Sequence, residues 1–568
     1  MISIGSEMRR WLSPPDPSTN HNAASKSHRE GTAKWFIEGE AFKEWKTTGS
    51  LLWIHGKPGS GKSILCSRII EDVERMCKTQ WDTILAYFYC DFQDPDKQNI
   101  RGLLSSLLVH FSTHSDHCAK IFSRLYSEYN DGSRQPSDAA LTKCLKDMLS
   151  AQGATYIIID ALDECPISPG IPSQREQILQ LIKELVELHL SDLHICITSR
   201  PEPDIQRILE PLTDRHISLH VESGQEEDIA LYVRSTMNSD NSFKRWNEAH
   251  KVLTIKTLSE KADGMFRWVF CQLELLRRCI PATVQRTLNS LPKSLDETYQ
   301  RMLEHIDESN WECAHRILQC LAVSARPLLI GEIAEVLAVD FDDATIPRLK
   351  DEWRSQDPIT HILSICSTLV TVDMDAGEVR FAHFSVQEYL TSERLASEEK
   401  NSIKRFYVHD ELAHVVLVQA CLSTLLQLDG DTVQNTVWSY PLACYAAEHW
   451  VHHAQFKDVS SHIQDAMQLL FHPAEKHVAA WIWIYDMDGS YSTYWFYGNG
   501  RAHTAASKPA ATPLYYAAQC GFTHLTRHLL VIHNQDANTE GAKYGTALQA
   551  ASFGGHLKVV QFLVEARR

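Results

Sequence analysis

Short apolar runs alternate with longer amphipathic segments between residues 51 and 222. The runs span residues 51–55, 84–90, 156–160, 194–198 and 216–221, and enough residues lie between them for helices. Alternating strands and helices of this kind predict a parallel sheet with helices on both faces. The fold class expected for this part of the chain is therefore α/β.

The pattern changes after residue 223, where apolar residues recur at helical spacing, as in Ile229, Val233, Val269 and Leu273. Farther on, two amphipathic helices between residues 318 and 337 flank a proline, and two β-prone runs, 369–372 and 379–382, bracket a turn. Helices with a small hairpin predict a winged-helix unit. Residues 401–500 carry further helix signals but no assignable motif.

The end of the chain contains an internal repeat. The segment 512–518, which reads T-P-L-Y-Y-A-A, recurs 34 residues later as T-A-L-Q-A-A at 546–551. This pattern resembles ankyrin repeats, which bury their apolar faces only by stacking, so that about three or more are normally needed. We therefore expect the array to continue beyond Arg568. Leu557, Val560 and Leu563 should be partly exposed unless further repeats, another chain or the preceding helices cover them.

These patterns divide the chain into six parts. We expect an N-terminal linker and docking helix at 1–50, a P-loop nucleotide-binding domain at 51–222, a helical domain at 223–315, a winged-helix-like domain at 316–400, a helical linker region at 401–505 and ankyrin repeats at 506–568.

Composition and charge narrow the class of protein. The chain has 55 Lys and Arg against 72 Asp and Glu, a net charge of −17, and this acidic balance argues against nucleic acid as a partner. No run of about 18 uninterrupted apolar residues occurs, so we expect no membrane span. The 15 cysteines include no C-x-x-C pair, which is typical of reduced thiols in a cytoplasmic protein.

The strongest chemical signal is a P-loop that follows the first apolar run and opens an amphipathic helix. Its glycines let backbone N–H groups surround a phosphate, its lysine reaches the β- and γ-phosphates of ATP, and its serine offers a hydroxyl to Mg²⁺. The residues of the loop are Gly56, Lys57, Pro58, Gly59, Ser60, Gly61, Lys62 and Ser63.

Acidic residues follow the strand predicted at 156–160. Because the carboxyl ends of parallel strands meet at one edge of the sheet, we expect Asp160 to lie beside the P-loop and to hold Mg²⁺ with Ser63. Asp163 or Glu164 would then orient or deprotonate the attacking water. At the end of the next strand, Arg200 could reach a γ-phosphate from the same edge.

The combination of G-K-P-G-S-G-K-S, I-I-I-D-A-L-D-E-C and C-I-T-S-R-P-E resembles the NACHT domains of fungal signal-transduction ATPases, which are relatives of animal NOD-like receptors. The resemblance extends to W-L-S-P-P-D-P at 11–17, F-Y-C-D-F at 88–92 and F-A-H-F-S-V-Q-E-Y-L at 381–390. It covers roughly residues 11–395.

The resemblance implies a nucleotide-controlled receptor that is closed with ADP, opens on exchange for ATP and then self-oligomerises. In such proteins a winged-helix histidine contacts the ADP phosphate, and the matching position here is His383. Many relatives have a G-x-P turn near the nucleotide, whereas this chain has Gly264, Met265 and Phe266, so we assign no nucleotide contact to this turn. Only about 50 residues precede the P-loop, and no G-x-S-x-G element supplies an effector activity.

Two other interpretations of the sequence remain open. The first is a P-loop NTPase that cycles continuously, or a kinase, although no acceptor-site signature is present. The second is an ankyrin scaffold with a vestigial ATPase, which the intact Lys62, Ser63, Asp160 and Glu164 disfavour. We favour a slow ATPase that serves as a switch and binds protein partners through its repeats. The activating ligand, the effector output, the oligomer size and the preference for ATP over GTP are not encoded in any motif we recognise.

Overall fold

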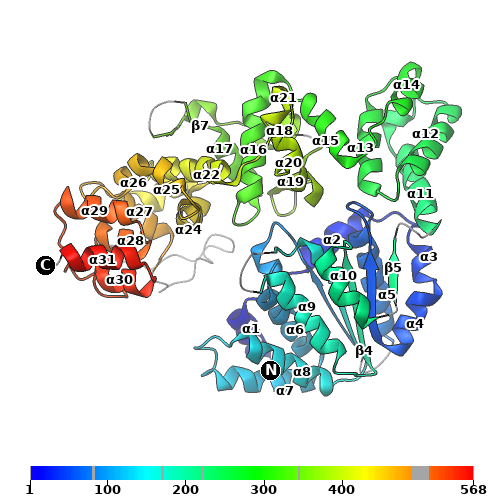
Figure 1. Ribbon diagram of the computed structural model, residues 1–568, viewed down its shortest axis with the longest axis horizontal. Coiled ribbons are helices and arrows are strands. Elements are labelled where there is room, and N and C mark those ends of the chain that lie inside the picture. Colours follow the sequence, from blue (N-terminus) through cyan, green and yellow to red (C-terminus); the bar gives the residue numbers. More distant parts are fainter. Residues whose placement is uncertain are drawn as a thin grey trace. The chain divides into compact units, whose positions relative to one another are not determined.

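The computed structural model describes residues 2–79, 83–167, 172–213, 215–219, 223–342, 346–366, 368–487 and 511–566. The chain divides into two compact units (Figure 1). The first comprises residues 1–301 together with His383–Ser385, and the second comprises residues 302–382 and 386–568.

A five-stranded parallel sheet forms the centre of the first unit. Its strands are β1 (Ser50–His55), β2 (Ile84–Tyr89), β3 (Thr155–Asp160), β4 (Leu193–Ser199) and β5 (His216–Ser218), in the spatial order β2-β3-β4-β1-β5. The first four coincide with the predicted apolar runs to within two residues. Residues 220–222, which include the end of the fifth run, lie outside the described residues.

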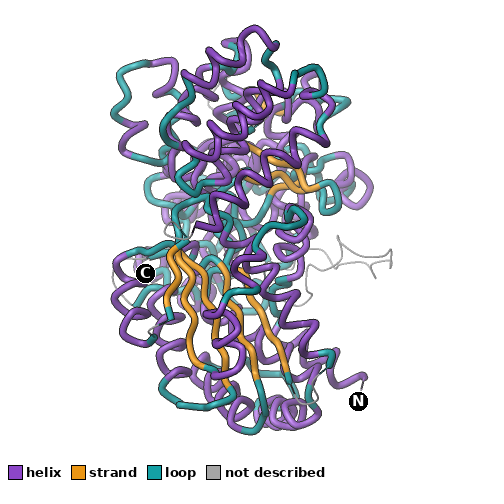
Figure 2. Tube along the Cα trace, turned by 90° about the vertical axis from the view of Figure 1, so that its right-hand side faces the viewer, coloured by secondary structure: helices purple, strands orange, loops and turns teal. Residues whose placement is uncertain are grey.

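Helices cover both faces of this sheet, as the sequence pattern predicted, and Figure 2 shows the strands side by side among them. Alternate residues of each strand enter different cores, so Trp53 and Ile157 pack on one face and Ile54 and Ile158 on the other. The helices that follow the strands are α5 (Lys62–Cys77), α6 (Ile100–His114), α7 (Asp116–Glu128), α8 (Asp138–Ser150), α9 (Gln174–Val186) and α10 (Pro203–Leu209).

Residues 2–48 form four helices of the same unit, α1 (Ile2–Leu12), α2 (Ser18–Ser27), α3 (Lys34–Ile37) and α4 (Glu40–Thr48). Trp11 of α1 belongs to one core of the sheet, whereas Phe42 and Trp45 of α4 belong to the core on the opposite face. The indole N–H of Trp45 donates to the carbonyl oxygen of Ile195 in β4 at 3.1 Å. This segment is therefore integral to the layers around the sheet.

A run of helices follows the sheet, as the spacing of apolar residues after 223 predicted. They are α11 (Ser223–Ser239), α12 (Glu248–Lys261), α13 (Phe266–Arg277), α14 (Val284–Asn289) and α15 (Leu295–Glu304). Val233 of α11, Leu258 of α12 and Leu273 of α13 are buried, which is the apolar stripe that the periodicity indicated.

The second unit begins with helices around a small antiparallel sheet, β6-β10-β9. Its strands are β6 (Leu328–Leu329), β9 (Val370–Asp373) and β10 (Glu378–Phe381). Its helices are α16 (Trp311–Val323), α17 (Ile330–Leu337), α18 (Pro358–Cys366), α20 (Glu393–Ala396) and, from Val386 on, α19 (Phe384–Leu390). A separate pair, β7 (Val339–Asp340) and β8 (Arg348–Leu349), follows α17. The predicted hairpin is formed by β9 and β10.

Helices make up the rest of the second unit. Those before the repeats are α21 (Asn401–Lys404), α22 (Asp410–Leu425), α23 (Val433–Thr436), α24 (Ala443–Ala454), α25 (Val459–His462), α26 (Gln464–Leu470) and α27 (His477–Ile484). Trp450 of α24 and Trp481 of α27 meet edge to face with their ring centroids 5.2 Å apart. Trp495 lies outside the described residues. No helix in the described ranges is long and apolar enough to cross a membrane.

The internal repeat folds as two similar helix pairs. The first pair is α28 (Pro513–Gln519) with α29 (Thr523–Val531), and the second is α30 (Ala547–Phe553) with α31 (Leu557–Ala566). Leu557 is exposed and Val560 is half-buried, as expected, but Leu563 is fully buried. Leu563 is covered because α31 packs against α29 and α30, and coverage by the preceding helices was the stated exception to the expected exposure.

Candidate functional site

The P-loop connects β1 to α5 at the carboxyl edge of the sheet. Gly59 and Gly61 have φ values of +70° and +86°, which side chains disfavour. A Cβ on Gly59 would also lie 2.4 Å from the Cβ of Arg267. The hydroxyl of Ser60 is buried without a hydrogen-bond partner among the described residues. Position 59 thus requires glycine for two reasons, its positive φ and the close approach of Arg267 from α13.

Lys62 begins α5, and its side chain folds back over the P-loop. Its Nζ donates to the carbonyl oxygens of Gly56, at 2.9 Å, and Lys57, at 3.2 Å. Burial lowers the pKa of the Lys62 ammonium, and the negative charge of Asp163 opposes this shift. A buried cation at the mouth of a glycine-rich loop provides the charge that a phosphate group requires.

Asp160 ends β3, and β4 lies between that strand and the P-loop strand β1. The carboxylate nevertheless reaches the P-loop helix, since it accepts hydrogen bonds from the hydroxyls of Ser63 and Thr198. Burial raises the pKa of Asp160, and these two hydrogen bonds oppose the shift. The structure therefore brings together Asp160 and Ser63, whose oxygens are of the kind that Mg²⁺ prefers.

Asp163 and Arg200 form an ion pair at the same edge. The guanidinium Nε of Arg200 lies 2.9 Å from one carboxylate oxygen of Asp163, and the backbone N–H of Arg200 donates to the other at 2.9 Å. The Arg200 guanidinium also lies over the ring of Phe384, 5.0 Å from its centroid. These contacts fix two of the predicted catalytic residues relative to each other.

Glu164 accepts a hydrogen bond from a neighbouring loop. The backbone N–H of Phe92, which follows β2, donates to its carboxylate at 3.2 Å. The residue is half-buried, and desolvation of its carboxyl group, followed by the negative charges of Asp91 and Asp163, raises the pKa of Glu164 well above its usual value. Glu164 is therefore held by the loop after β2, beside two other acidic residues.

His383 lies in the first unit with the P-loop residues. Its Nδ1 accepts the backbone N–H of Ser385 at 3.1 Å, which places the ring proton of the neutral form on Nε2. The Ser385 hydroxyl bonds both to this Nδ1, at 2.7 Å, and to the hydroxyl of Tyr299, at 2.8 Å. Burial lowers the pKa of His383, and the cations Arg267, Arg200 and Lys62 lower it further. The histidine is thus a neutral donor among cationic groups.

The start of α13 contacts the P-loop, which the sequence reasoning missed. The backbone N–H of Arg267 donates to the carbonyl oxygen of Gly59 at 3.1 Å, and the Phe266 ring packs beside Gly61. The Arg267 guanidinium is hydrogen-bonded to the hydroxyl of Tyr299. No motif marked Arg267, because the comparable turn lacks the proline that many relatives have there. Its position after Gly264 was the only available signal.

A glycine-rich loop between a parallel strand and a helix, an acid at the end of another strand and a serine beside that acid define an α/β P-loop NTPase. Two family models match parts of the chain. The model for nephrocystin 3, N-terminal, matches residues 31–200, and the winged helix domain of GPI inositol-deacylase matches residues 278–400.

Two curated fungal proteins are similar in sequence. The azaphilone pigments biosynthesis cluster protein L of Monascus ruber is 36% identical over 297 residues, which cover 49% of this chain and 60% of that protein. The vegetative incompatibility protein HET-E-1 of Podospora anserina is 26% identical over 370 residues, which cover 63% of this chain and 26% of that protein. Together with the P-loop, these matches support a NACHT-like NTPase related to fungal proteins.

Among solved structures, the Aeropyrum pernix ORC2 protein in ADPNP and ADP complexes matches 64% of this chain and 95% of its own chain. The identity is 12% and the TM-score is 0.31, which does not establish a shared overall fold.

Proposed function

We propose that this protein is a nucleotide-controlled switch of the NACHT type, which binds ATP or ADP with Mg²⁺ at the P-loop and hydrolyses ATP slowly. The six-part division of the chain given above is part of this proposal. In the proposed activation cycle, the protein is closed when it binds ADP and opens when ATP replaces ADP. The open form then oligomerises.

The observation that carries the proposal is the set of cationic groups around one neutral histidine. Lys62, Arg200 and Arg267 all depress the pKa of His383, so all three lie close enough to act on it electrostatically. Cations that lie near one ring raise the electrostatic potential there, and a positive potential favours the binding of an anion. The triphosphate or diphosphate of a nucleotide supplies that charge directly beside the P-loop glycines.

Each predicted site residue has a role in this proposal. Gly56, Pro58, Gly59, Ser60 and Gly61 shape the loop, and Lys62 contacts the phosphates. Ser63 and Asp160 hold Mg²⁺, whose bound form would neutralise phosphate charge. Asp163 and Glu164 orient the attacking water, and Arg200 contacts the γ-phosphate. Their adjacency at one edge of the sheet supports these roles.

His383 is proposed as the residue that distinguishes the closed form. Its Nδ1 is occupied by Ser385, so only the Nε2–H remains to donate to a phosphate oxygen. A donor that contacts ADP in one conformation alone stabilises that conformation by its differential affinity. This is the contact that the resemblance to NACHT proteins implies for His383.

The repeat-like helix pairs at 511–566 are proposed as an ankyrin-type sensor for a protein partner. The name of the relative HET-E-1 connects that protein with vegetative incompatibility, and we propose nonself recognition as the process in which this chain acts. The matched regions cover 60% and 26% of the two curated relatives. Both the protein partner of the repeats and the role in nonself recognition are therefore part of the proposal.

The identity of the bound nucleotide tests the proposal. Protein purified without added nucleotide is gently denatured, and the released small molecules are separated by ion-exchange chromatography and identified by mass. A switch in its resting state should release close to one equivalent of ADP. A protein that releases no nucleotide, and that binds neither labelled ADP nor labelled ATP when these are added, is not a nucleotide-controlled switch.

Turnover separates this function from its alternatives. A switch hydrolyses ATP at well below one per second, because its states must be long-lived, whereas many turnovers per second would favour a continuously cycling NTPase. Transfer of labelled γ-phosphate to an added hydroxyl acceptor would favour a kinase. Tight ATP binding with no hydrolysis over hours would favour a scaffold with a vestigial ATPase.

A further inference from the structure

A polar segment near the N-terminus contacts the loop that follows β2. We define the strap as residues 15–21, which include the first turn of α2, and the Phe92 loop as residues 91–98. The carbonyl oxygen of Pro15 accepts a hydrogen bond from Ser106 of α6 at 3.1 Å, and His21 Nδ1 lies 3.2 Å from the hydroxyl of Tyr89. The strap is thus fixed to elements on both sides of the loop.

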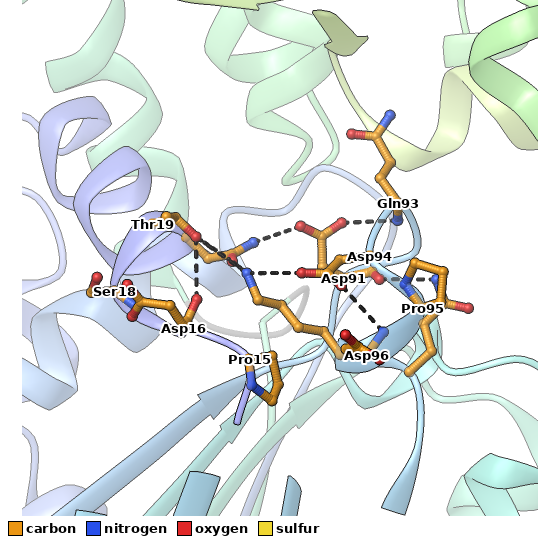
Figure 3. Close-up of polar contacts among 12 residues, drawn as sticks. Pro15, Asp16, Ser18, Thr19, Asp91, Gln93, Asp94, Pro95 and Asp96 are labelled. Atoms are coloured by element: carbon orange, nitrogen blue, oxygen red, sulfur yellow. Dashed lines mark hydrogen bonds and ion pairs between the residues drawn. The ribbon is translucent and has the colours of Figure 1, made fainter. Parts of the chain in front are cut away.

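Lys97 connects the strap to the Phe92 loop. Figure 3 shows Thr19 of the strap beside Asp91 and Asp94 of the loop. Its side chain is only 4% exposed, and its Nζ donates to Asn20 Oδ1 at 2.7 Å and to Thr19 Oγ1 at 3.1 Å. The same ammonium lies 3.4 Å from the carboxylate of Asp94. A buried lysine is retained in a fold only where polar partners compensate its lost hydration, and two of these partners come from the strap.

Asn20 completes the connection, because both its amide oxygen and its amide nitrogen form hydrogen bonds. While its Oδ1 accepts from Lys97, its Nδ2 donates to the carboxylate of Asp91 at 2.9 Å. Asp91 is 5% exposed and lies just beyond the end of β2. Asn20 therefore bridges a buried cation and a buried anion at the two ends of the Phe92 loop.

The Phe92 loop in turn contacts the candidate site at two points. The backbone N–H of Phe92 donates to Glu164, and the Phe92 ring packs on that of Phe384 with centroids 4.6 Å apart. Gln98 braces the loop, since its amide donates to the carbonyl oxygens of Asp91, at 3.1 Å, and Phe92, at 2.7 Å. Any displacement of the loop therefore moves the group that holds Glu164.

We propose that the strap is an inhibitory element of the ATPase, in which Asn20 acts as a positioning residue that keeps the Phe92 loop against Glu164 and so withholds this carboxylate from water. The inference rests on the proposed function, since it assigns regulation to the same site. Release of the strap would free Glu164 from the Phe92 amide and move it away from Asp91. Glu164 faces Asp91, Asp160 and Asp163, and its charge also acts on Lys62.

The test compares two strap variants with a matched control in the intact chain. Asn20→Ala removes the bridge, and Asn20→Asp keeps its shape but sets a carboxylate against Asp91. Both variants lose the hydrogen bond from Asn20 to Asp91. Both should therefore raise the single-turnover rate of ATP hydrolysis by about fivefold, the order expected from that one bond, with unchanged affinity for ATP. Asn22→Ala, at an exposed asparagine of the same helix, should leave the rate unchanged.

A double-mutant cycle shows whether the effect passes through Glu164. In the Glu164→Gln background, Asn20→Ala should give no acceleration, because the group it releases is no longer a base. In the wild-type background it should also shift the acid limb of the pH–rate profile to lower pH. Glu164 then moves away from Asp91, whose charge raises the pKa of this carboxyl more than the Phe92 hydrogen bond lowers it. Thermal unfolding of each variant measures any general loss of stability. Such a loss would produce neither a dependence of the acceleration on Glu164 nor a shift of the pH–rate profile.

The outcomes separate the strap from the function on which it rests. Unchanged or slower hydrolysis in both Asn20 variants, with ATP affinity retained, would overturn the inhibitory strap. An acceleration of equal size in the Glu164→Gln background would also overturn it, since the strap would then act elsewhere. If the wild-type protein itself binds no ATP, the proposed function fails, and the strap as an inhibitor of its ATPase fails with it.

Discussion

Arg200 and Asp163 hold each other at the carboxyl edge of the sheet. Both the guanidinium Nε and the backbone N–H of Arg200 contact the Asp163 carboxylate, each at 2.9 Å. Two residues predicted for separate catalytic roles are therefore coupled, so a substitution of either one changes the position of the other. Lys62, Glu164 and His383 lie outside this ion pair, so substitutions there can separate binding, hydrolysis and conformational change.

The first prediction concerns nucleotide binding. Lys62→Ala should weaken the affinity for ATP by roughly ten- to a hundredfold, because a charge-assisted contact of this kind contributes about 1.5 to 3 kcal/mol. Titration with a fluorescent ATP analogue measures the effect. Lys57→Ala is the matched control, since this lysine of the same loop pairs with the exposed Asp263. Equal affinities for the Lys62 variant and the wild type would contradict the assigned phosphate contact.

The second prediction concerns hydrolysis. Glu164→Gln preserves the shape of the side chain and removes its charge, so ATP should still bind while the rate of hydrolysis falls, as expected when only a transition-state contact is lost. Because burial and Asp91 raise the pKa of Glu164, the wild-type rate should increase with pH well above the usual range of a glutamate. The variant should lack this pH dependence. If it retains the same profile, another group limits the reaction.

The third prediction concerns ADP release. His383→Ala removes the Nε2–H donor, so the variant should release a fluorescent ADP analogue faster than the wild type in stopped-flow chase experiments. Ser385→Ala should have a smaller effect in the same direction, because it removes one of two contacts that orient the ring. His524→Ala, at an exposed position of α29, serves as the control. Identical release from the His383 variant and the wild type would leave this residue with a packing role.

The fourth prediction concerns a histidine cluster in the second unit. His414 Nδ1 lies 2.8 Å from His453 Nδ1, and His453 Nε2 lies 2.8 Å from the hydroxyl of Tyr445. Burial is the main cause that lowers the pKa of His414 and His449 to about 4 and that of His453 to about 2, with neighbouring histidines and, for His449, Arg326 adding to it.

These folded histidines stay neutral where unfolded ones take up protons. The free energy of unfolding is therefore highest above about pH 6.5 and falls as the pH decreases from there toward 4. Each histidine that is neutral in the folded state and protonated in the unfolded state lowers it by about 1.4 kcal/mol per pH unit. Urea unfolding at pH 7.5 and 5.5 measures the difference. His453→Gln should reduce the pH dependence, whereas His462→Gln, at a half-exposed site, should not. Equal unfolding midpoints at both pH values would contradict the prediction.

Local sequence accounts for most of the strands and for the core of the site. The apolar runs predicted β1 to β4 because a buried parallel strand needs apolar residues on both faces. Gly56 to Ser63 predicted the phosphate-binding loop because such a sequence both forms the loop and starts a helix there. These features depend on residues close together in the chain, which one sequence displays directly.

Other features depend on contacts between distant segments, and only the tertiary structure decided them. The segment 13–27 has the composition of a polar linker, yet Asn20 and Lys97, 77 residues apart, bond in a buried network. Arg267 carries no motif, but the packing of α13 brings it to Gly59. Composition and periodicity report which face of an element is apolar, whereas the partner of a buried polar group depends on how the elements pack.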